Sequence, residues 1–326
     1  MRALRCNEYG PPESLSVEDI AAPTPGAGEV TVDVMAAAVN WADNLIINNK
    51  YQRSAEPPFT VGNDFAGVVA EVGEGVTDWS PGDRVRGAAL TGAFAERVCV
   101  KPASLRSLPA NVDWQTGAAI SIAYETAIHS LLSAARVKEG DDVVVLGASG
   151  GVGSACVELA VLLGARVIAC ASSQERLAIA RELGAVETIN YDTEDLKNRI
   201  KALTDGGADV VLDPVGGAYA EQALRATKFR GRYIVLGFAA GEIPRVPLNL
   251  FLLKGVEMTG LDVVAFPRQA PAEWARNNTR LERLLADGKL RPHVSRCYPL
   301  ERAAEAIRDV AERRTTGKVI IDVDIA

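Results

Sequence analysis

The sequence predicts an α/β protein of two domains, an antiparallel β-barrel domain and a doubly wound parallel sheet of six strands. Three observations predict this fold class. Residues 1–120 alternate between short apolar runs and turn residues. From about Ala118 onward, apolar strands alternate with long helices, which is typical of a parallel α/β sheet. At 326 residues, the chain also has the length of about two domains.

The β-barrel domain is predicted from strands in which apolar and polar residues alternate. Such runs occupy residues 29–34, 65–73 and 94–100, with turns such as residues 81–83 between them. Alternation with a period of two buries one face of a strand and leaves the other face in water. We therefore expect antiparallel strands that form a barrel over residues 1–121.

The parallel sheet is predicted from six apolar runs separated by helical segments. Each run is short enough for a strand, and the intervening segments are long enough for helices. Because strands and helices alternate, we expect parallel strands with helices on both faces of the sheet. The predicted strands are residues 143–147, 166–171, 188–190, 210–213, 233–237 and 257–261.

A glycine-rich turn follows the first of these strands and precedes a helix. Its spacing is Ala148-x-Gly150-x-x-Gly153, with alanine in place of the first glycine of the dinucleotide-binding pattern. Glycines let the backbone approach a pyrophosphate closely, and the next helix offers N–H groups at its N-terminus. The turn therefore predicts a dinucleotide site at Gly150, Gly151, Val152 and Gly153. A glycine-rich turn that binds no ligand is the alternative.

The end of the second strand indicates which dinucleotide is bound. An acidic residue at this place would bind the ribose 2′-hydroxyl of NAD and repel a 2′-phosphate. The chain instead has Ser172 and Ser173, followed by Arg176. Hydroxyl groups and a guanidinium suit a phosphate dianion, because charge-assisted hydrogen bonds are strong. The sequence therefore favours NADPH, the alternative being that the serines only cap the next helix and that Arg176 is solvated.

The last part of the chain is predicted to return to the first domain. After the sixth strand, two short β segments at residues 291–297 and 317–323 flank a helix at residues 300–312. The predicted boundaries are residues 1–121 with 290–326 for the barrel domain, 122–265 for the cofactor domain and 266–289 for a connecting helix.

The composition excludes several classes of partner. The net charge is −7 and no basic run is present, which argues against nucleic acid and against an anionic membrane surface. No apolar stretch approaches the roughly 18 residues of a membrane span. The five cysteines are scattered without a C-x-x-C pair, so neither disulfides nor zinc knuckles are indicated. We therefore expect a soluble, unprocessed cytoplasmic protein that acts on a small-molecule substrate.

A series of short motifs, taken in order, is specific for one superfamily. The chain resembles the medium-chain dehydrogenases/reductases and, within them, the zinc-free quinone oxidoreductases related to zeta-crystallin. The motifs are residues 39–43 with Tyr51, then 58–69, 81–85, 123–127, 213–217, 231–238 and 317–319.

This resemblance implies a GroES-like barrel domain, a Rossmann cofactor domain and NADPH as the cofactor. The glycine turn is then expected on the pyrophosphate, and Tyr191 near the adenine. Residues at the ends of the later strands are expected at the cofactor as well. The complete set of cofactor residues implied is Gly150, Gly151, Val152, Gly153, Ser172, Ser173, Arg176, Tyr191, Val215, Gly237, Phe238, Ala239 and Asp262.

The resemblance also bears on zinc. Zinc relatives need thiolate or imidazole ligands in the barrel domain, with one coordination position open for the substrate. The matching positions here carry Asn40, Asn63 and Ile122, and the histidines His129 and His293 lie outside these motifs. We therefore expect no metal site, and we expect both histidines to be packed or partly exposed.

Without a metal, a conjugated acceptor is the most feasible substrate. Hydride transfer to a simple ketone would lack a Lewis acid to stabilise the developing charge. In a quinone or an enone, that charge spreads into a phenolate or enolate, which ordinary hydrogen-bond donors can stabilise. The sequence therefore predicts NADPH-dependent reduction of a quinone or another α,β-unsaturated carbonyl, as the resemblance also implies.

The resemblance places four catalytic candidates. It implies that Asn40, Asp43 and Tyr51 line the nicotinamide and substrate pocket, and that Thr126 adjoins the nicotinamide. Tyr51 is expected either to donate a hydrogen bond or proton to the oxyanion or to pack on the nicotinamide. Asn40 and Asp43 are alternatively residues that only hold their loop. Lys318 is expected to be either a cofactor contact or a solvated lysine beside a strand.

Two other functions stay open. An enoyl thioester reductase has the same fold and would act on CoA or carrier-protein thioesters. A non-enzymatic NADPH-binding protein is the second, although the acidic composition and the presence of Tyr51 and Thr126 argue against it. From the resemblance we also expect a homodimer through the edge of the cofactor sheet, at the apolar strand of residues 256–261.

Overall fold

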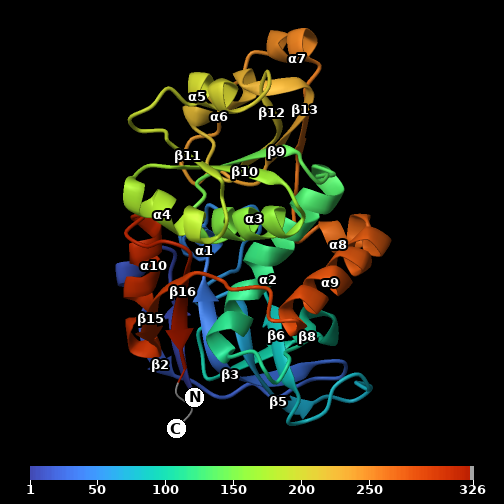
Figure 1. The fold of residues 1–326 in the computed structure, drawn as a ribbon. Helices are drawn as coiled ribbons and strands as arrows, with labels where there is room; N and C mark the ends of the chain where they lie inside the picture. The colour runs from blue at the N-terminus through green and yellow to red at the C-terminus, as the bar shows by residue number, and fades with distance from the viewer. Residues whose placement is uncertain (324–326) are drawn as a thin grey trace. The chain divides into compact units, whose positions relative to one another are not determined.

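The computed structural model describes residues 1–323, which form two compact units. Within the described residues, unit 1 comprises Met1–Ile122 together with residues 285–323, and unit 2 comprises Ala123–Leu284. Figure 1 labels the helices and strands of both units. No helix within residues 1–323 is long and apolar enough to cross a membrane.

Unit 1 is built on two β-sheets. Its strands are β1 (Arg2–Cys6), β2 (Ser16–Asp19), β3 (Val30–Val39), β4 (Phe59–Thr60), β5 (Asp64–Val72), β6 (Arg84–Ala88), β7 (Arg97–Val100), β8 (Leu105–Ser107), β15 (Val294–Pro299) and β16 (Lys318–Asp322). The larger sheet has the order β15-β16-β3-β5-β6-β8, with β7 paired to β3, and the smaller has the order β2-β1-β4. Neighbours pair antiparallel, except that β15 and β16 are parallel.

Strand β3 is the centre of unit 1. It pairs with β5, β7 and β16, so its residues are buried along most of its length. Glycine at Gly67 lets β5 approach β3, because a Cβ there would lie 2.0 Å from the carbonyl oxygen of Asp33. The core beside β3 contains apolar side chains from segments far apart in the chain, such as Val32, Phe65 and Ile321.

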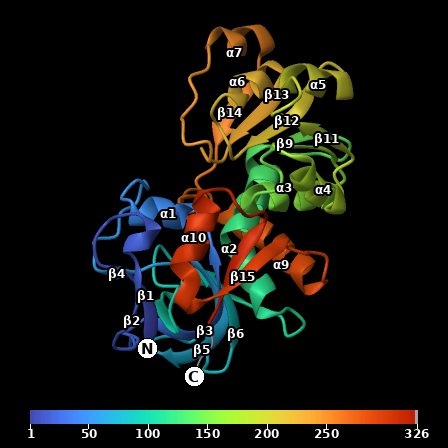
Figure 2. The same cartoon turned by 90° about the vertical axis from the view of Figure 1, so that its left-hand side faces the viewer.

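Short helices complete unit 1. Helix α1 (Trp41–Ile47) follows β3 directly, and α10 (Ala303–Ala311) lies between β15 and β16 in the chain. Figure 2 shows α10 beside α1 and β15, in agreement with the contacts between these elements. Short 3₁₀ turns occur at Pro12–Ser14, Pro102–Ser104 and Leu300–Arg302.

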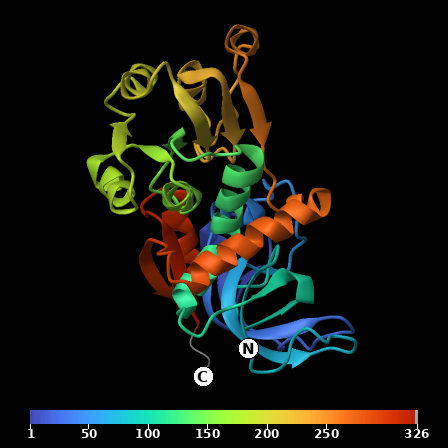
Figure 3. The same ribbon diagram turned by 45° about the vertical axis from the view of Figure 1, so that its right-hand side comes forward.

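Unit 2 contains the predicted six-stranded parallel sheet. Its strands are β9 (Asp142–Leu146), β10 (Arg166–Ala171), β11 (Glu187–Asn190), β12 (Ala208–Asp213), β13 (Thr227–Val235) and β14 (Glu257–Gly260). Their order is β11-β10-β9-β12-β13-β14, and every pair is parallel. Figure 3 shows β12, β13 and β14 side by side, in yellow to orange. The predicted fold class is therefore confirmed, because this order reverses between β9 and β12 as in a doubly wound sheet.

Helices cover both faces of this sheet. The helices of unit 2 are α3 (Gly151–Leu162), α4 (Gln174–Glu182), α5 (Leu196–Leu203), α6 (Tyr219–Arg225), α7 (Asn249–Lys254), α8 (Phe266–Gln269) and α9 (Pro271–Ala286). Helix α2 (Trp114–His129) spans the boundary between the units and is followed by a π-helix at Ser130–Ala134. Figure 1 shows α3 and α4 on one face and α5 and α6 on the other. The apolar run Val143, Val144 and Val145 is therefore fully buried, as a strand covered on both faces must be.

Candidate functional site

The predicted cofactor residues of unit 2 follow the carboxyl ends of the parallel strands. The glycine turn follows β9, Ser172 and Ser173 follow β10, Tyr191 follows β11, Val215 follows β12, residues 237–239 follow β13, and Asp262 follows β14. Because parallel strands run in one direction, these positions share one edge of the sheet. Ligands of open α/β sheets bind at this edge.

The glycine turn is shaped by contacts that exclude side chains. Gly147 has φ of 58°, in the left-handed region, and a Cβ there would lie 2.7 Å from Cγ2 of Val215. A Cβ at Gly153 would lie 2.1 Å from the carbonyl oxygen of Gly147. Gly150 is the N-cap of α3, and its N–H donates to the Gly147 carbonyl oxygen over 2.9 Å. The turn is therefore tight, and the N–H groups of the first turn of α3 are available to an anion.

Arg176 connects the second strand end to the glycine turn. Ser173 caps α4, since its Oγ accepts the Arg176 N–H over 3.3 Å. The Arg176 guanidinium donates to Oγ of Ser149, within the glycine turn, over 3.4 Å. Ser173 therefore caps α4, and the Arg176 guanidinium at the same time lies against the glycine turn.

Two tyrosine rings pack together where β11 ends. The centroids of Tyr191 and Tyr219 are 4.1 Å apart, with an angle of 33° between the ring planes. The Tyr219 hydroxyl donates to Oδ1 of Asp192 over 2.7 Å, and burial raises the pKa of Tyr191. Tyr219 was not predicted from the sequence, and the signal available was an aromatic residue two positions after Gly217.

Asp213 holds the loop that follows β12. Its Oδ1 accepts the backbone N–H groups of Val215 and Gly216, each over 2.8 Å, and its Oδ2 accepts the Tyr233 hydroxyl over 2.6 Å. All of these bonds are buried. The carbonyl oxygen of Val215 in turn accepts the N–H of Ala240, which joins the β12 loop to the β13 loop. Val215 was predicted as a cofactor residue, whereas Asp213 and Tyr233 were part of the family motifs but were not predicted as site residues.

The β13 and β14 ends contribute Phe238 and Asp262. Phe238 is 37% exposed, and its loop is fixed by a bond from the Ala239 N–H to the carbonyl oxygen of Pro214. The Asp262 carboxylate accepts the N–H groups of Val264 and Ala265 over 3.0 and 3.2 Å. Asp262 therefore closes its own turn ahead of α8.

In unit 1, three neighbouring strands place polar side chains at the same end. Asn40 follows the last residue of β3, Asp64 begins β5, and Lys318 begins β16. The registers pair Ala38 with Asp64 and Val39 with Val319, so these three residues meet at one corner of the sheet. Sequence analysis assigned no role to Asp64, whose signal was a buried carboxylate at the start of an apolar strand.

Hydrogen bonds connect these three side chains. Asn40 Nδ2 donates to Oδ2 of Asp64 over 2.9 Å and to the carbonyl oxygen of Ala38 over 3.3 Å. Lys318 Nζ donates to Oδ1 of Asn40 over 2.7 Å and lies 3.4 Å from Oδ2 of Asp64. The Asn40 N–H also donates to Oδ2 of Asp43 over 2.7 Å. Lys318 is only 3% exposed, so it is not a solvated lysine.

The cluster contains one ion pair and one neutral acid. Burial raises the pKa of Asp43 to about 8; the Asn40 N–H opposes the rise, and nearby Asp64 adds to it. Asp43 is therefore protonated at neutral pH, and its Oδ1 has no hydrogen-bond partner within residues 1–323. Burial also raises the pKa of Asp64, opposed chiefly by the Lys318 ammonium. Donors from Lys318, Asn40 and the Ile122 N–H all contact Asp64, which supports its ionised form.

The other two catalytic candidates belong to different units. Tyr51 is half-buried and packs against the apolar core of unit 1. Thr126 lies on the unit 2 part of α2 and is 6% exposed. Its carbonyl oxygen accepts a hydrogen bond from Oγ of Ser130 over 2.6 Å. The structure thus brings Asn40 and Asp43 together with Asp64 and Lys318.

His129 is packed inside unit 2. It is fully buried, its ring lies 4.7 Å from that of Phe266, and its Nδ1 lies 3.2 Å from Nδ2 of Asn277. Burial lowers its pKa to about 4, so the ring is neutral at neutral pH. Within residues 1–323, no group of three or more His, Cys, Asp or Glu side chains could hold a metal ion.

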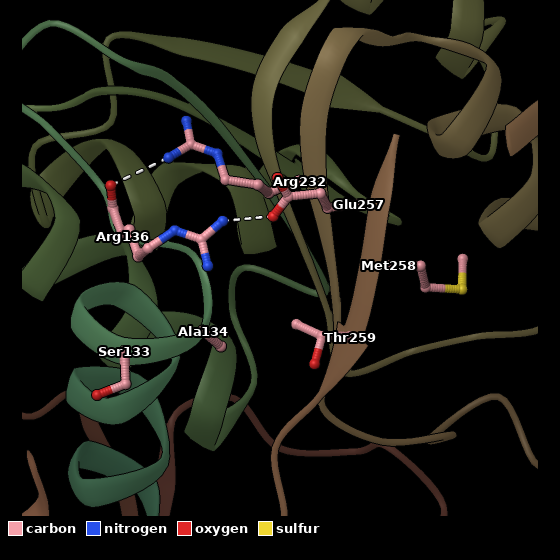
Figure 4. A pocket seen from close by; sticks show the side chains of 7 residues that line it. All are labelled: Ser133, Ala134, Arg136, Arg232, Glu257, Met258 and Thr259. Carbon is pink, nitrogen blue, oxygen red and sulfur yellow. Dashed lines mark hydrogen bonds and ion pairs between the residues drawn. The ribbon is translucent and has the colours of Figure 1, made fainter. Parts of the chain in front are cut away.

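A pocket of about 420 Å³ in unit 2 contains none of the predicted site residues. Figure 4 shows the polar groups at its wall: Arg136 pairs with Glu257, and Arg232 donates to the carbonyl oxygen of Arg136 over 3.0 Å. Arg232 also pairs with Asp141 over 2.9 Å. The pocket is lined by Ser133, Ala134, Arg136, Arg232, Glu257, Met258 and Thr259.

Two family models match the chain. The model described as alcohol dehydrogenase GroES-like domain matches residues 26–110, and the model described as zinc-binding dehydrogenase matches residues 151–280. The first match lies in unit 1 and the second in unit 2.

Relatives and solved structures cover almost the whole chain. A quinone oxidoreductase-like protein 2 homolog of Nematostella vectensis is 38% identical, over 98% of this chain and 88% of the relative. The structure of a quinone oxidoreductase from Pseudomonas syringae pv. Tomato superposes with a TM-score of 0.91 at 31% identity, covering 98% of this chain and 99% of the other. The structure of Escherichia coli quinone oxidoreductase complexed with NADPH superposes with a TM-score of 0.91 at 26% identity, covering 99% and 100%.

Proposed function

Because the chain belongs to the quinone oxidoreductase family of the medium-chain dehydrogenases/reductases, we propose that it reduces a quinone or another α,β-unsaturated carbonyl compound with NADPH. The observation that carries this proposal is the alignment of the candidate cofactor residues along the carboxyl edge of the unit 2 sheet. A relative with the same fold, from Escherichia coli, has NADPH bound in its structure.

The residues at the glycine turn fit the phosphates of NADPH. The turn leaves no room for a side chain at Gly153, and the first N–H groups of α3 supply donors for a pyrophosphate. We assign the pyrophosphate to residues 150–153. The Arg176 guanidinium, lying against Ser149, with Ser172 and Ser173 beside it in the chain, suits the 2′-phosphate.

The remaining cofactor residues are assigned by the strand ends they follow. Tyr191, with Tyr219 packed on it, offers an aromatic surface for the adenine. Asp213 holds Val215 through a buried hydrogen bond, and a backbone bond from the Ala239 N–H to the Pro214 carbonyl oxygen joins residues 237–239 to the same loop. These residues suit the nicotinamide end together with Asp262 and Thr126.

We propose that the reaction uses no metal, since the donor set does not fit zinc. The amide oxygen of Asn40 accepts a hydrogen bond from the Lys318 ammonium, and this buried positive charge would repel a divalent cation. Asn63 donates its Nδ2 to the carbonyl oxygens of Ala89 and Leu90. Ile122 has no ligand atom in its side chain, so none of the three positions offers a thiolate or an imidazole.

The chemistry assigned to the protein is the stabilisation of an oxyanion. When bound, NADPH supplies a hydride from C4 of its nicotinamide. The developing phenolate or enolate oxygen then needs a hydrogen-bond donor, and we assign the Tyr51 hydroxyl to this role. Asn40 and Asp43 are assigned to the wall of the acceptor site, and Trp41 and Leu45 make that wall suitable for a flat, apolar substrate.

We further propose a homodimer formed through β14. Within residues 1–323 this strand pairs only with β13, so one edge carries unpaired backbone groups. Large apolar side chains are exposed close by in the chain, among them Leu252 at 85% and Leu253 at 70%. A reducing compartment, such as the cytoplasm, suits the five cysteines, all of which are free thiols.

A substrate screen tests the proposed function. Purified protein is mixed with NADPH and, separately, with quinones, enones and enoyl thioesters, and the loss of NADPH absorbance is followed. We expect turnover with quinones or enones. Turnover with CoA thioesters alone would favour an enoyl thioester reductase, and NADPH binding without any turnover would favour a non-enzymatic binding protein.

A further inference from the structure

We propose that Asp64 and Lys318 are positioning residues that fix Asn40, and through it the first turn of α1, in the arrangement that the acceptor site requires. This inference rests on the proposed function, because it concerns the wall assigned to the acceptor. It assigns a role to two residues, Asp64 and Lys318, that take no direct part in the chemical step.

The cluster is assembled only by tertiary structure. Asn40 and Lys318 are 278 positions apart in the chain, and Asn40 and Asp64 are 24 apart. They meet because β16, β3 and β5 are successive neighbours in the sheet. Asn40 stands at the point where β3 ends and α1 begins, so the cluster acts on the start of that helix.

The orientation of the Asn40 side-chain amide is fixed by its hydrogen bonds. Both protons of Nδ2 are used, one on the Asp64 carboxylate and one on the carbonyl oxygen of Ala38. Oδ1 accepts from the Lys318 ammonium. An amide with a carboxylate on its nitrogen side and an ammonium on its oxygen side cannot flip without placing like polar atoms together. Asn40 therefore has one orientation, set by two charges.

Stability alone does not explain a buried ion pair at this corner. Lys318 is 3% exposed and Asp64 is fully buried, so both charges have lost their hydration. Apolar or neutral groups of similar size are often as stable as a buried ion pair, whereas removing one partner is strongly destabilising. The pair is explained instead by the geometry that it imposes on Asn40.

That geometry is transmitted to the acceptor wall through α1. The Asn40 N–H donates to the Asp43 carboxyl, and the Asp43 N–H donates to the Asn40 carbonyl oxygen over 3.1 Å, which closes the first turn. Trp41 and Leu45 lie on this helix. A change in the Asn40 side chain therefore moves the residues assigned to the flat acceptor.

The test separates positioning from stability with two variants. Lys318→Met leaves the Asp64 charge buried without its cation, and Lys318→Met/Asp64→Asn removes both charges while keeping their volumes. Lys101→Met is the matched control, because Lys101 is an exposed lysine of the same unit, paired with Glu29 over 3.0 Å. Each variant is measured for thermal unfolding, acceptor KM and kcat, NADPH Kd, and amide hydrogen exchange of residues 41–47 without ligands.

We expect the single variant to lose stability and the double variant to regain most of it. Both should show an acceptor KM raised about tenfold or more and faster hydrogen exchange in α1, with NADPH Kd within about twofold of wild type. Lys101→Met should change none of these. The proposal is overturned if the double variant regains wild-type KM and wild-type exchange together with its stability.

The experiment distinguishes failure of the proposed reductase function from failure of the positioning role. If the wild-type protein reduces no acceptor, the KM readout is lost, whereas hydrogen exchange in α1 still reports on positioning. If hydrogen exchange in α1 of the double variant is then as slow as in the wild-type protein, that result alone overturns the positioning role.

Discussion

Replacement of Asp43 by asparagine should change how the stability of unit 1 depends on pH. Asp43 is 1% exposed, and burial raises its pKa to about 8 in the folded protein. In the unfolded chain its pKa is about 3.9. The asparagine side chain would keep an oxygen for the Asn40 N–H but would have no proton to lose.

The magnitude follows from linkage. Between about pH 4 and pH 8, the folded state keeps a proton on Asp43 that the unfolded state has lost, so raising the pH favours unfolding. The stabilisation from the raised pKa is present in full below about pH 4 and is lost as the pH rises to about 8. The slope is about 1.4 kcal/mol per pH unit, or about 2.7 kcal/mol between pH 5 and pH 7. Solvent screening does not reduce this value, because the carboxyl is buried.

Denaturant unfolding followed by tryptophan fluorescence measures this effect. Trp41, Trp79 and Trp114 lie in unit 1, so they report on the unit that contains Asp43. The free energy of unfolding of Asp43→Asn, minus that of wild type, should increase by about 2.7 kcal/mol from pH 5 to pH 7. Asp78→Asn is the matched control, because it makes the same substitution at an exposed position of the same unit. A pH-independent difference for Asp43→Asn would refute the buried neutral acid.

Further predictions concern the cofactor, the β12 loop and the acceptor. Arg176→Ala should raise the Kd for NADPH about tenfold to hundredfold, the loss of about 1.5–3 kcal/mol for a charge-assisted bond, with little effect on NADH; equal losses in a binding titration would argue against the phosphate assignment. Tyr233→Phe should lower the free energy of unfolding of unit 2 by about 1–3 kcal/mol, because it removes the hydroxyl bonded to the buried Asp213; an unchanged value in denaturant titration would contradict this. Tyr51→Phe should lower kcat at least about tenfold with unchanged NADPH Kd, since one oxyanion donor is worth roughly 10²–10³ in kcat at well-formed sites; unchanged steady-state turnover would remove Tyr51 from the chemistry.

The unit 2 sheet was predictable because its signals are local. A parallel strand covered on both faces requires a continuous apolar run, and β9 has such a run over Val143, Val144 and Val145. The tight turn at Gly147 and Gly153 requires glycines for steric reasons that act over a few residues. Short elements were missed for the converse reason. Helices such as α8 (Phe266–Gln269) are too short to show a helical period.

The polar cluster of unit 1 was not predictable, because it depends on strand order. Lys318 stands at the start of a strand, and nothing nearby in the sequence distinguishes a buried ammonium from a solvated one. Its environment is set by Asn40 and Asp64, which reach it only after β16 and β5 pair with β3. The same holds for the Tyr233 hydroxyl, whose partner Asp213 lies on the neighbouring strand. Periodicity predicts which residues are buried, and strand order decides which of them touch.

The most direct test of a metal-free, NADPH-dependent reduction is steady-state NADPH oxidation by purified wild-type protein after treatment with a strong chelator. We predict that NADPH is consumed in the presence of a quinone or an enone and that chelation leaves the rate unchanged. Consumption that disappears on chelation and returns with zinc, or NADPH binding with no reduction of any conjugated acceptor, would contradict this mechanism.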